Sequence, residues 1–209
     1  MNKLLFILLL FACQQASSQN RPLDAAAIQQ IKQGVQQAAR TTLTITSEFT
    51  QEKEMSILND KIISSGAFYF KKERSLRWEY IHPFSYIITI RGDLISISNE
   101  GEVKSFNTQS NRVFAEVNNI IIGSVNGTLL DDNSFSAGYS QNRDHYIVTL
   151  TPLSPSLKEN LEKIIIFFDK ANFTVNQLEM VEPAGDFTRI TFSKKQLNQP
   201  IPDEVFVLR

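Results

Sequence analysis

The two histidines are the side chains of this sequence best suited to acid–base catalysis or metal binding near neutral pH. His82 and His145 are far apart, and neither has another histidine, a cysteine or a carboxylate at metal-ligand spacing. Asp144 adjoins His145, but neighbouring residues on a strand point to opposite faces. We therefore expect two ordinary histidines, at the surface or at a sheet edge.

Acidic pairs and serines are the other groups that could support chemistry. Glu52 and Glu54 share a predicted strand face, and Asp131 and Asp132 are adjacent in a predicted turn; such pairs are usually solvated charges. No serine lies in a G-x-S-x-G sequence, the nucleophile motif of one hydrolase class. The eight glycines are scattered rather than gathered in a phosphate-binding loop. The sequence therefore predicts no enzyme, no metal site and no cofactor.

The N-terminus has the pattern of a secretory signal peptide over residues 1–18. Lys3 supplies positive charge, and Leu4–Ala12 is an apolar run that is too short to span a bilayer stably. Small residues at Ala16-Ser17-Ser18 favour cleavage before Gln19. We expect an exported chain with a single domain over residues 19–209.

The only cysteine, Cys13, allows a second interpretation of the N-terminus. The sequence LFAC at residues 10–13 resembles a lipobox, in which Cys13 would become the lipidated first residue. Under either interpretation the mature protein has no disulfide framework, and a chain that starts at Gln19 has no thiol at all. The domain must therefore be stabilised by its core.

The charge balance argues against nucleic acid as a partner. The chain has 21 basic and 22 acidic residues, so its net charge is −1, and removing Lys3 with the signal peptide makes it −2. Nucleic-acid binding would call for a basic patch. No later apolar run approaches the roughly eighteen residues of a membrane-spanning helix. We expect a protein that is soluble or tethered by a lipid.

Hydrophobic periodicity predicts a helix followed by strands. Asp24 can cap a helix in which Ile28, Ile31 and Val35 recur at helical spacing. From residue 42 the period changes to two, and turn signals separate the strands of an antiparallel meander. In one of these strands, Leu76, Trp78 and Tyr80 share a face.

The alternation is interrupted mid-chain. Between residues 111 and 125 the apolar residues recur at helical spacing. Strands are predicted again at 134–139, 146–151, 163–169, 175–181 and 186–194, with a helical turn at 155–161 and a strand-like end at 204–208. The expected class is mainly β, with about ten or eleven strands and two or three helices, one at the front and one inserted mid-chain.

Three ordered segments carry a resemblance to a known family. They are GAFYFKKERSLRWEYIHPFSYIITIRGDLISIS from Gly66, FTQEK from Phe49, and GDFTRITFSKKQLNQPIPDEVF from Gly185. In order and spacing they resemble the periplasmic lipoprotein carriers of the LolA family. The resemblance implies an open, incomplete antiparallel β-barrel closed by a helical lid. Its apolar cavity would hold lipoprotein acyl chains during transit from the inner to the outer membrane.

The resemblance also implies partners and site residues. The partners would be acylated lipoproteins, an inner-membrane lipoprotein-releasing ABC transporter and an outer-membrane acceptor, and the carrier would be a periplasmic monomer. The family's lid latch is an Arg followed by Pro, whereas this chain offers Lys72 or Arg74 near that corner. The candidates for the cavity wall are Phe68, Phe70, Leu76, Trp78 and Tyr80, and those for the lid underside are Val113, Phe114, Val117, Ile120 and Ile121.

Three alternatives stay open at this point. Phenylalanine is abundant, with fifteen in the chain, and the candidate wall residues could simply pack a closed core. If Cys13 is lipidated, a membrane-tethered LolB-like lipoprotein receptor with the same half-barrel becomes the favoured function. A carrier of another lipid would have the same fold.

Overall fold

The computed structural model describes residues 21–56, 60–72, 75–107, 122–125 and 127–208. Eleven of the strands are six to twelve residues long, and β1 has only two. The elements in chain order are β1 (Arg21–Pro22), α1 (Ala25–Thr41), β2 (Thr44–Met55), β3 (Asp60–Lys71), β4 (Ser75–His82), β5 (Tyr86–Arg91), β6 (Leu94–Asn99), β7 (Glu102–Asn107), η2 (Thr128–Asp131), β8 (Phe135–Gln141), β9 (His145–Pro152), α3 (Pro155–Lys158), β10 (Lys163–Asp169), β11 (Val175–Val181), β12 (Phe187–Leu197) and η3 (Asp203–Phe206).

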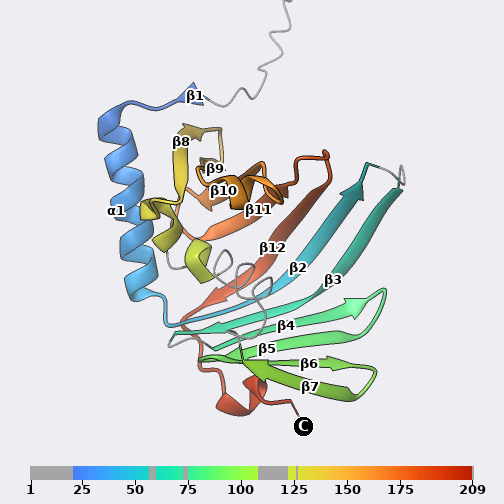
Figure 1. The fold of residues 1–209 in the computed structure, drawn as a ribbon. Helices are drawn as coiled ribbons and strands as arrows, with labels where there is room; N and C mark the ends of the chain where they lie inside the picture. Colours follow the sequence, from blue (N-terminus) through green and yellow to red (C-terminus); the bar gives the residue numbers. More distant parts are fainter. Residues whose placement is uncertain (1–20, 57–59, 73–74, 108–121, 126, 209) are drawn as a thin grey trace, which may run out of the picture.

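The strands form one antiparallel sheet that does not close on itself. Its order is β1-β8-β9-β10-β11-β12-β2-β3-β4-β5-β6-β7, so β1 and β7 are its two edges. In Figure 1 the long strands β12, β2 and β3 join an upper wing, β8 to β11, to a lower wing, β4 to β7, and α1 runs along one side. The predicted fold class, an open and mainly β half-barrel with helices, is confirmed.

The helix α1 begins and ends for local reasons. The Asp24 side chain accepts a hydrogen bond of 2.8 Å from the backbone N–H of Ala27, the usual interaction of an N-cap. Ile31 and Val35 are buried on the face that meets the sheet. At the other end, the Lys72 amine donates to the Arg40 carbonyl at 2.8 Å, which satisfies one of the carbonyls left free in a last turn.

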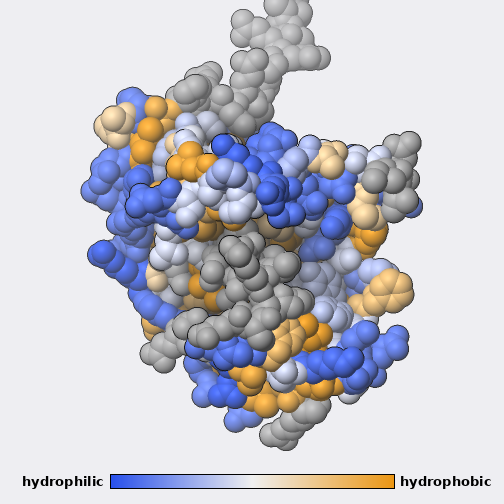
Figure 2. Space-filling view, viewed as in Figure 1, coloured by the Kyte–Doolittle hydropathy of each residue, from blue (hydrophilic) through white to orange (hydrophobic). Residues whose placement is uncertain are grey.

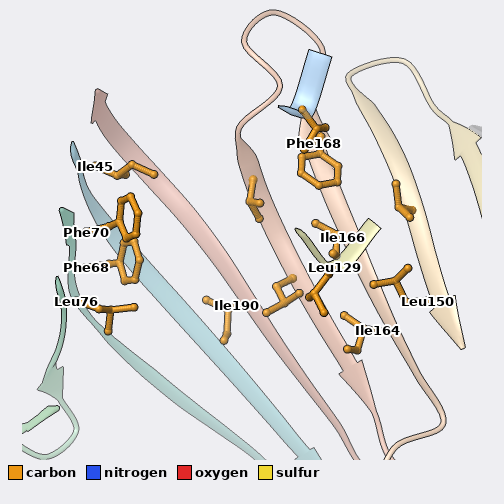
Figure 3. Packing of buried hydrophobic residues seen from close by; sticks show 14 of the residues in the cluster. Ile45, Phe68, Phe70, Leu76, Leu129, Leu150, Ile164, Ile166, Phe168 and Ile190 are labelled. Carbon is orange, nitrogen blue, oxygen red and sulfur yellow. The ribbon is translucent and has the colours of Figure 1, made fainter. Parts of the chain in front are cut away.

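Alternation along the central strands separates an apolar inner face from a polar outer face. Phe68 and Phe70 on β3 and Leu76 and Trp78 on β4 are all buried, with polar residues between them. Figure 3 shows two groups of inner-face side chains, one on β2 to β4 and one on β9 and β10, with Ile190 of β12 between them. Together they belong to one hydrophobic core.

The C-terminal segment differs from the strand predicted at residues 204–208. It forms the 3-10 helix η3 after Pro202, because the prolines at 200 and 202 have no N–H to donate to a strand ladder. Phe206 is buried, and Arg77 of β4 donates to the Val205 carbonyl at 3.1 Å. Since Arg77 alternates with Leu76 and Trp78, η3 covers the outer face of the lower wing.

Two other predicted boundaries also change. The strand expected to end at residue 194 continues in β12 to Leu197, after a register shift between Ser193 and Gln196. Of the helix predicted over residues 111–125, only 122–125 lies among the described residues, and that part is helical. The short helical turn near Pro155 is confirmed as α3.

Replacing Gly66 of β3 by alanine is expected to destabilise the sheet strongly. A Cβ at this position would lie 1.8 Å from the Glu79 carbonyl oxygen of β4, so the two strands would have to separate. Overpacking of this kind costs about 1–3 kcal/mol or more. The matched control is Gly138→Ala in β8, where the nearest atom would be 3.8 Å away. Urea unfolding of both variants is the measurement, and equal stabilities would contradict the prediction.

Candidate functional site

Aromatic rings from four strands form a cluster on the inner face. Trp78 lies 4.8 Å from Phe49 and 4.9 Å from Phe68, measured between ring centroids. Phe192 of β12 is 5.3 Å from Phe68 and 5.9 Å from Trp78, and Tyr80 is 5.0 Å from Phe49. Tilted and edge-on contacts at these distances are favourable. This aromatic cluster, Phe49, Phe68, Trp78, Tyr80 and Phe192, forms a wide apolar wall.

A small cavity borders this wall. It lies where α1, the helical residues 122–125 and strands β2, β3, β11 and β12 meet, and it holds about 20 Å³, room for about one water molecule. Most of its lining is apolar, with three hydroxyl groups and one amine. The lining residues are Ala38, Thr42, Ile45, Ser47, Phe68, Val125, Phe173, Thr174, Val175, Phe192 and Lys195.

Close approach of α1 to the sheet shapes one end of the cavity. Gly34 packs against the ring of Phe173, and a Cβ on Gly34 would come within 2.4 Å of that ring. Phe173 has a positive φ of 57° and stacks on Tyr146 at 5.4 Å. Ala38, one turn after Gly34, then lines the cavity. Gly34 therefore lets α1 approach the Phe173 ring, and the small side chain of Ala38 borders the cavity.

The predicted wall residues fall into two sets. Phe68 lines the cavity directly. Trp78 and Tyr80 do not line it, but they belong with Phe68 to the aromatic cluster. Phe70 and Leu76 are buried in the same core, where they are register partners. The five residues predicted for the underside of the lid, and Arg74, lie outside the described residues.

Sequence reasoning did not identify most of the other lining residues. Phe192 could have been found from alternation along its strand, since Ile190 shares its face. Thr42, Ser47 and Thr174 carry no sequence signal for a pocket, although all three are buried. Lys72, one of the two latch candidates, donates to Arg40 of α1, and its role as a latch stays a prediction.

Lys195 is the charged residue of the cavity lining. Its amine donates to the Thr174 hydroxyl at 2.7 Å and to the Val175 carbonyl at 3.0 Å, and also to the Asn176 side-chain oxygen. Burial lowers the pKa of the Lys195 amine to about 8, and the charge of Asp169 opposes that shift. Hydrogen bonds thus hold the Lys195 amine in the cavity lining, where it is partly shielded from water.

Polar groups within the aromatic cluster are few. Tyr80 donates a 2.8 Å hydrogen bond to the Gln51 side-chain oxygen, and burial raises the pKa of Tyr80 to about 12. The indole nitrogen of Trp78 and the hydroxyl of Ser47 are buried without a hydrogen-bond partner among the described residues. Apart from these groups, the aromatic cluster offers apolar contact.

The histidines and acidic residues considered as candidates for chemistry do not form a common site. His82 is exposed, whereas the His145 ring nitrogen lies 3.2 Å from the Asn176 amide. Asp131 binds Lys32 and Gln36 of α1, each at 3.1 Å. Over the part of the chain that the structure describes, no three His, Cys, Asp or Glu side chains group as a metal site would require. None of the helices described there is long and apolar enough to cross a bilayer.

A larger hollow on the sheet is a poorer candidate for a binding site. It holds about 540 Å³ and is bordered by Thr46, Glu48, Thr50 and Lys194, which alternate with the inner-face residues of their strands. Polar side chains at an open surface have no special affinity for an apolar ligand. Ile81 also borders this hollow and is 51% exposed. The most exposed of the large hydrophobic residues described is Phe84 at the β4–β5 turn, at 77%; Figure 2 shows that turn protruding at the right.

Comparison with known proteins identifies similar chains. The family model described as outer membrane lipoprotein carrier protein LolA matches residues 40–209. An uncharacterized conserved protein from Thermus thermophilus has a TM-score of 0.53 at 8% identity, covering 86% of this chain and 92% of that one. MucB, also solved in the Pseudomonas aeruginosa MucA/MucB complex, has a TM-score of 0.51 at 12% identity, covering 88% of this chain and 63% of its own.

A third solved structure is a LolA superfamily protein from Nitrosomonas europaea, with a TM-score of 0.44 at 12% identity, covering 86% of this chain and 96% of that one. No curated protein sequence matches this chain. At these identities, the Thermus protein and MucB show a shared fold alone.

Lys195 is expected to make the fold more stable as the pH rises from about 8 to 10.5. The pKa of its amine is about 8 in the folded protein against 10.5 ordinarily, so the unfolded chain binds more protons in this interval. The free energy of unfolding therefore increases with pH over this interval. Below pH 8 both states are protonated, and the stabilisation by the neutral amine is absent. Urea unfolding of wild type and Lys195→Met at pH 7.5 and 10.5 should show a larger gain in the wild type.

The control for this measurement is Lys194→Met. Lys194 is exposed and pairs with Glu48 at 2.9 Å, so its replacement should leave the wild-type pH dependence intact. Equal pH dependence in wild type and Lys195→Met would contradict the burial of the Lys195 amine.

Proposed function

Because the chain belongs to the LolA family of outer membrane lipoprotein carrier proteins, we propose that it is a periplasmic carrier of lipoproteins. In this proposal the inner face of the half-barrel holds the acyl chains of the cargo between the inner and outer membranes. The signal-peptide pattern of residues 1–18 supports export. The protein turns over no substrate; it shields hydrocarbon from water.

The observation that carries this proposal is the position of the cavity. It lies between α1, residues 122–125 and the aromatic cluster, on a face that is not covered by a second sheet among the described elements. Phe68 and Phe192 belong both to the lining and to the cluster. An acyl chain that entered here would contact aromatic rings continuously.

The volume of the cavity implies that the ligand must enlarge it. At about 20 Å³ it is far too small for a long acyl chain, as expected for a close-packed interior. Each buried CH₂ contributes about 0.8 kcal/mol, so ten of them would contribute about 8 kcal/mol towards displacing side chains. Binding offset by such a rearrangement stays moderate, which suits a carrier that must release its cargo.

The partners follow from the route of the cargo. The carrier would receive acylated lipoproteins from an inner-membrane lipoprotein-releasing ABC transporter and deliver them to an outer-membrane acceptor, acting as a monomer. The lid of the proposed cavity would be the segment over residues 111–125, with Val113, Phe114, Val117, Ile120 and Ile121 facing the ligand. Lys72 or Arg74 would hold it closed.

A membrane-tethered lipoprotein receptor is the second candidate, and the LFAC sequence at residues 10–13 favours it. Lipidation of Cys13 would anchor the same half-barrel at a membrane. Mass spectrometry of the mature N-terminus separates the two functions. A chain that starts at Gln19 supports the carrier, and a diacylglyceryl group on Cys13 supports the receptor.

A charge in the cavity wall is expected to weaken acyl binding. Phe192 is half-buried and lines the cavity, so Phe192→Glu would place a carboxylate against the ligand. Burying a carboxylate against hydrocarbon is costly even in a cavity that Lys195 also lines, and we expect the affinity for a diacylated lipopeptide to fall by about tenfold or more. Trp78 emission reports the binding, because Trp78 packs against Phe192.

The matched control is Ser193→Glu on the next residue of β12, which points outward and is exposed. It should bind the lipopeptide as the wild type does. Equal affinities of Phe192→Glu and Ser193→Glu, with both variants folded, would show that acyl chains bind elsewhere.

Replacing both histidines is expected to leave transfer unaffected. His82 and His145 take no part in the proposed binding, so a protein with both changed to glutamine should move lipoprotein between membrane vesicles at the wild-type rate. Circular dichroism establishes that the variant is folded. Loss of transfer by the folded variant would be evidence for acid–base chemistry and against a carrier.

A further inference from the structure

A β-bulge places Lys195 on the inner face of the sheet. Along β12, Ser193 pairs with Glu48 of β2, but the next pair is Gln196 with Thr46. Two residues of β12, Lys194 and Lys195, therefore stand opposite the single residue Ser47. Lys194 has a positive φ of 51°, and its amine meets Glu48 on the outer face.

The bulge thus reverses the alternation that the strand would otherwise follow. Ile190 and Phe192 face inward, so an unbroken strand would turn residue 194 inward and residue 195 outward. Instead Lys195 lines the cavity. Bulges often re-aim a side chain next to a functional site.

Among the described residues, the Lys195 ammonium group donates hydrogen bonds to uncharged acceptors only. Its three hydrogen bonds go to a hydroxyl, a backbone carbonyl and an amide oxygen, of Thr174, Val175 and Asn176. Asp169 is the carboxylate that influences its pKa, and does so through space. The three hydrogen bonds use all three N–H donors of the ammonium group, so an anion would displace one neutral acceptor, and the charge-assisted bond to a carboxylate is the stronger of the two.

Ser47 supplies a second and independent indication. It is 7% exposed and lines the same cavity directly across the bulge from Lys195. Its hydroxyl has no hydrogen-bond partner among the described residues. Buried hydroxyls are usually bonded, so an unpaired one that lines a cavity is suited to a ligand atom.

We propose that Ser47 and Lys195 form a polar anchor that binds the carboxylate of a fatty acid whose chain lies in the apolar cavity. This inference rests on the proposed function and extends it to a ligand class, the free fatty carboxylates. The Ser47 hydroxyl donates to one carboxylate oxygen, and the Lys195 ammonium group exchanges one of its neutral acceptors for the other oxygen. The chain then runs along Phe68 and Phe192.

The test compares three ligands of equal chain length: laurate, methyl laurate and dodecan-1-ol. Their affinities are measured by calorimetry at pH 7 for wild type, Lys195→Met, Lys194→Met and Ser47→Ala. We expect wild type to prefer laurate over dodecan-1-ol by about tenfold, as for a hydrogen bond to a charged group. Lys195→Met should lose this preference while its affinity for dodecan-1-ol is kept, and Lys194→Met should behave as wild type.

Ser47→Ala has a double signature that a structural hydroxyl would not give. Removing an unpaired buried hydroxyl should leave the unfolding midpoint unchanged or raise it. The same change should weaken laurate and methyl laurate several-fold, because both present an acyl carbonyl oxygen, and should affect dodecan-1-ol less. A lowered midpoint with unchanged affinities would overturn the assignment of Ser47.

The ligand affinities distinguish a failure of the proposed Ser47–Lys195 anchor from a failure of the proposed carrier function. Equal affinity of wild type for laurate and dodecan-1-ol, unchanged in Lys195→Met, would overturn the anchor and leave acyl binding in place. Tighter binding of methyl laurate than of laurate would also overturn it, since the ester has no charge. Failure of the wild type to bind any of the three ligands would contradict the apolar cavity itself, and with it the proposed carrier.

Discussion

The apolar inner face of a curved sheet determines the rest of this structure, because no second sheet covers it among the residues that the structure describes. Alternation along the strands aims aromatic and aliphatic side chains at the same space from both wings (Figure 3). In the part of the chain that the structure describes, α1 and short segments are what lies over that face (Figure 1). A helix presents a narrower apolar stripe than a sheet does, and a small cavity is left where Ala38 of α1 and Phe173 meet the sheet.

The same constraint explains why the cavity is small and still suited to an apolar ligand. Exposing a large hollow to water would cost free energy in proportion to its apolar area, and Phe68, Phe173 and Phe192 fill most of the space. These side chains are not covalently restrained by a disulfide, since Cys13 is the only cysteine. Hydrocarbon can replace their mutual contacts with contacts of the same kind, so the proposed acyl binding would require a rearrangement of these side chains alone.

The apolar inner face of the sheet was predictable from the sequence, and the polar part of the cavity was not. Period-two alternation of Leu76 and Trp78 needs no tertiary information, and the structure places both on the inner face. Lys195 would face outward under the same rule. Its true position depends on the register shift opposite Ser47, which is a property of two strands that are distant in the chain. The C-terminal 3-10 helix was mistaken for a strand because apolar residues in so short a segment fit either pattern.

Photo-crosslinking of a lipopeptide tests the central claim most directly. A diazirine at the end of one acyl chain would label whatever side chains surround that chain in the complex. Peptide mapping should place the label on the inner-face residues of β2, β3 and β12, among them Phe68 and Phe192, and competition by unlabelled lipopeptide should remove it. Labelling confined to the exposed β4–β5 turn around Phe84, or to the outer face of the sheet, would contradict an acyl chain held inside the half-barrel.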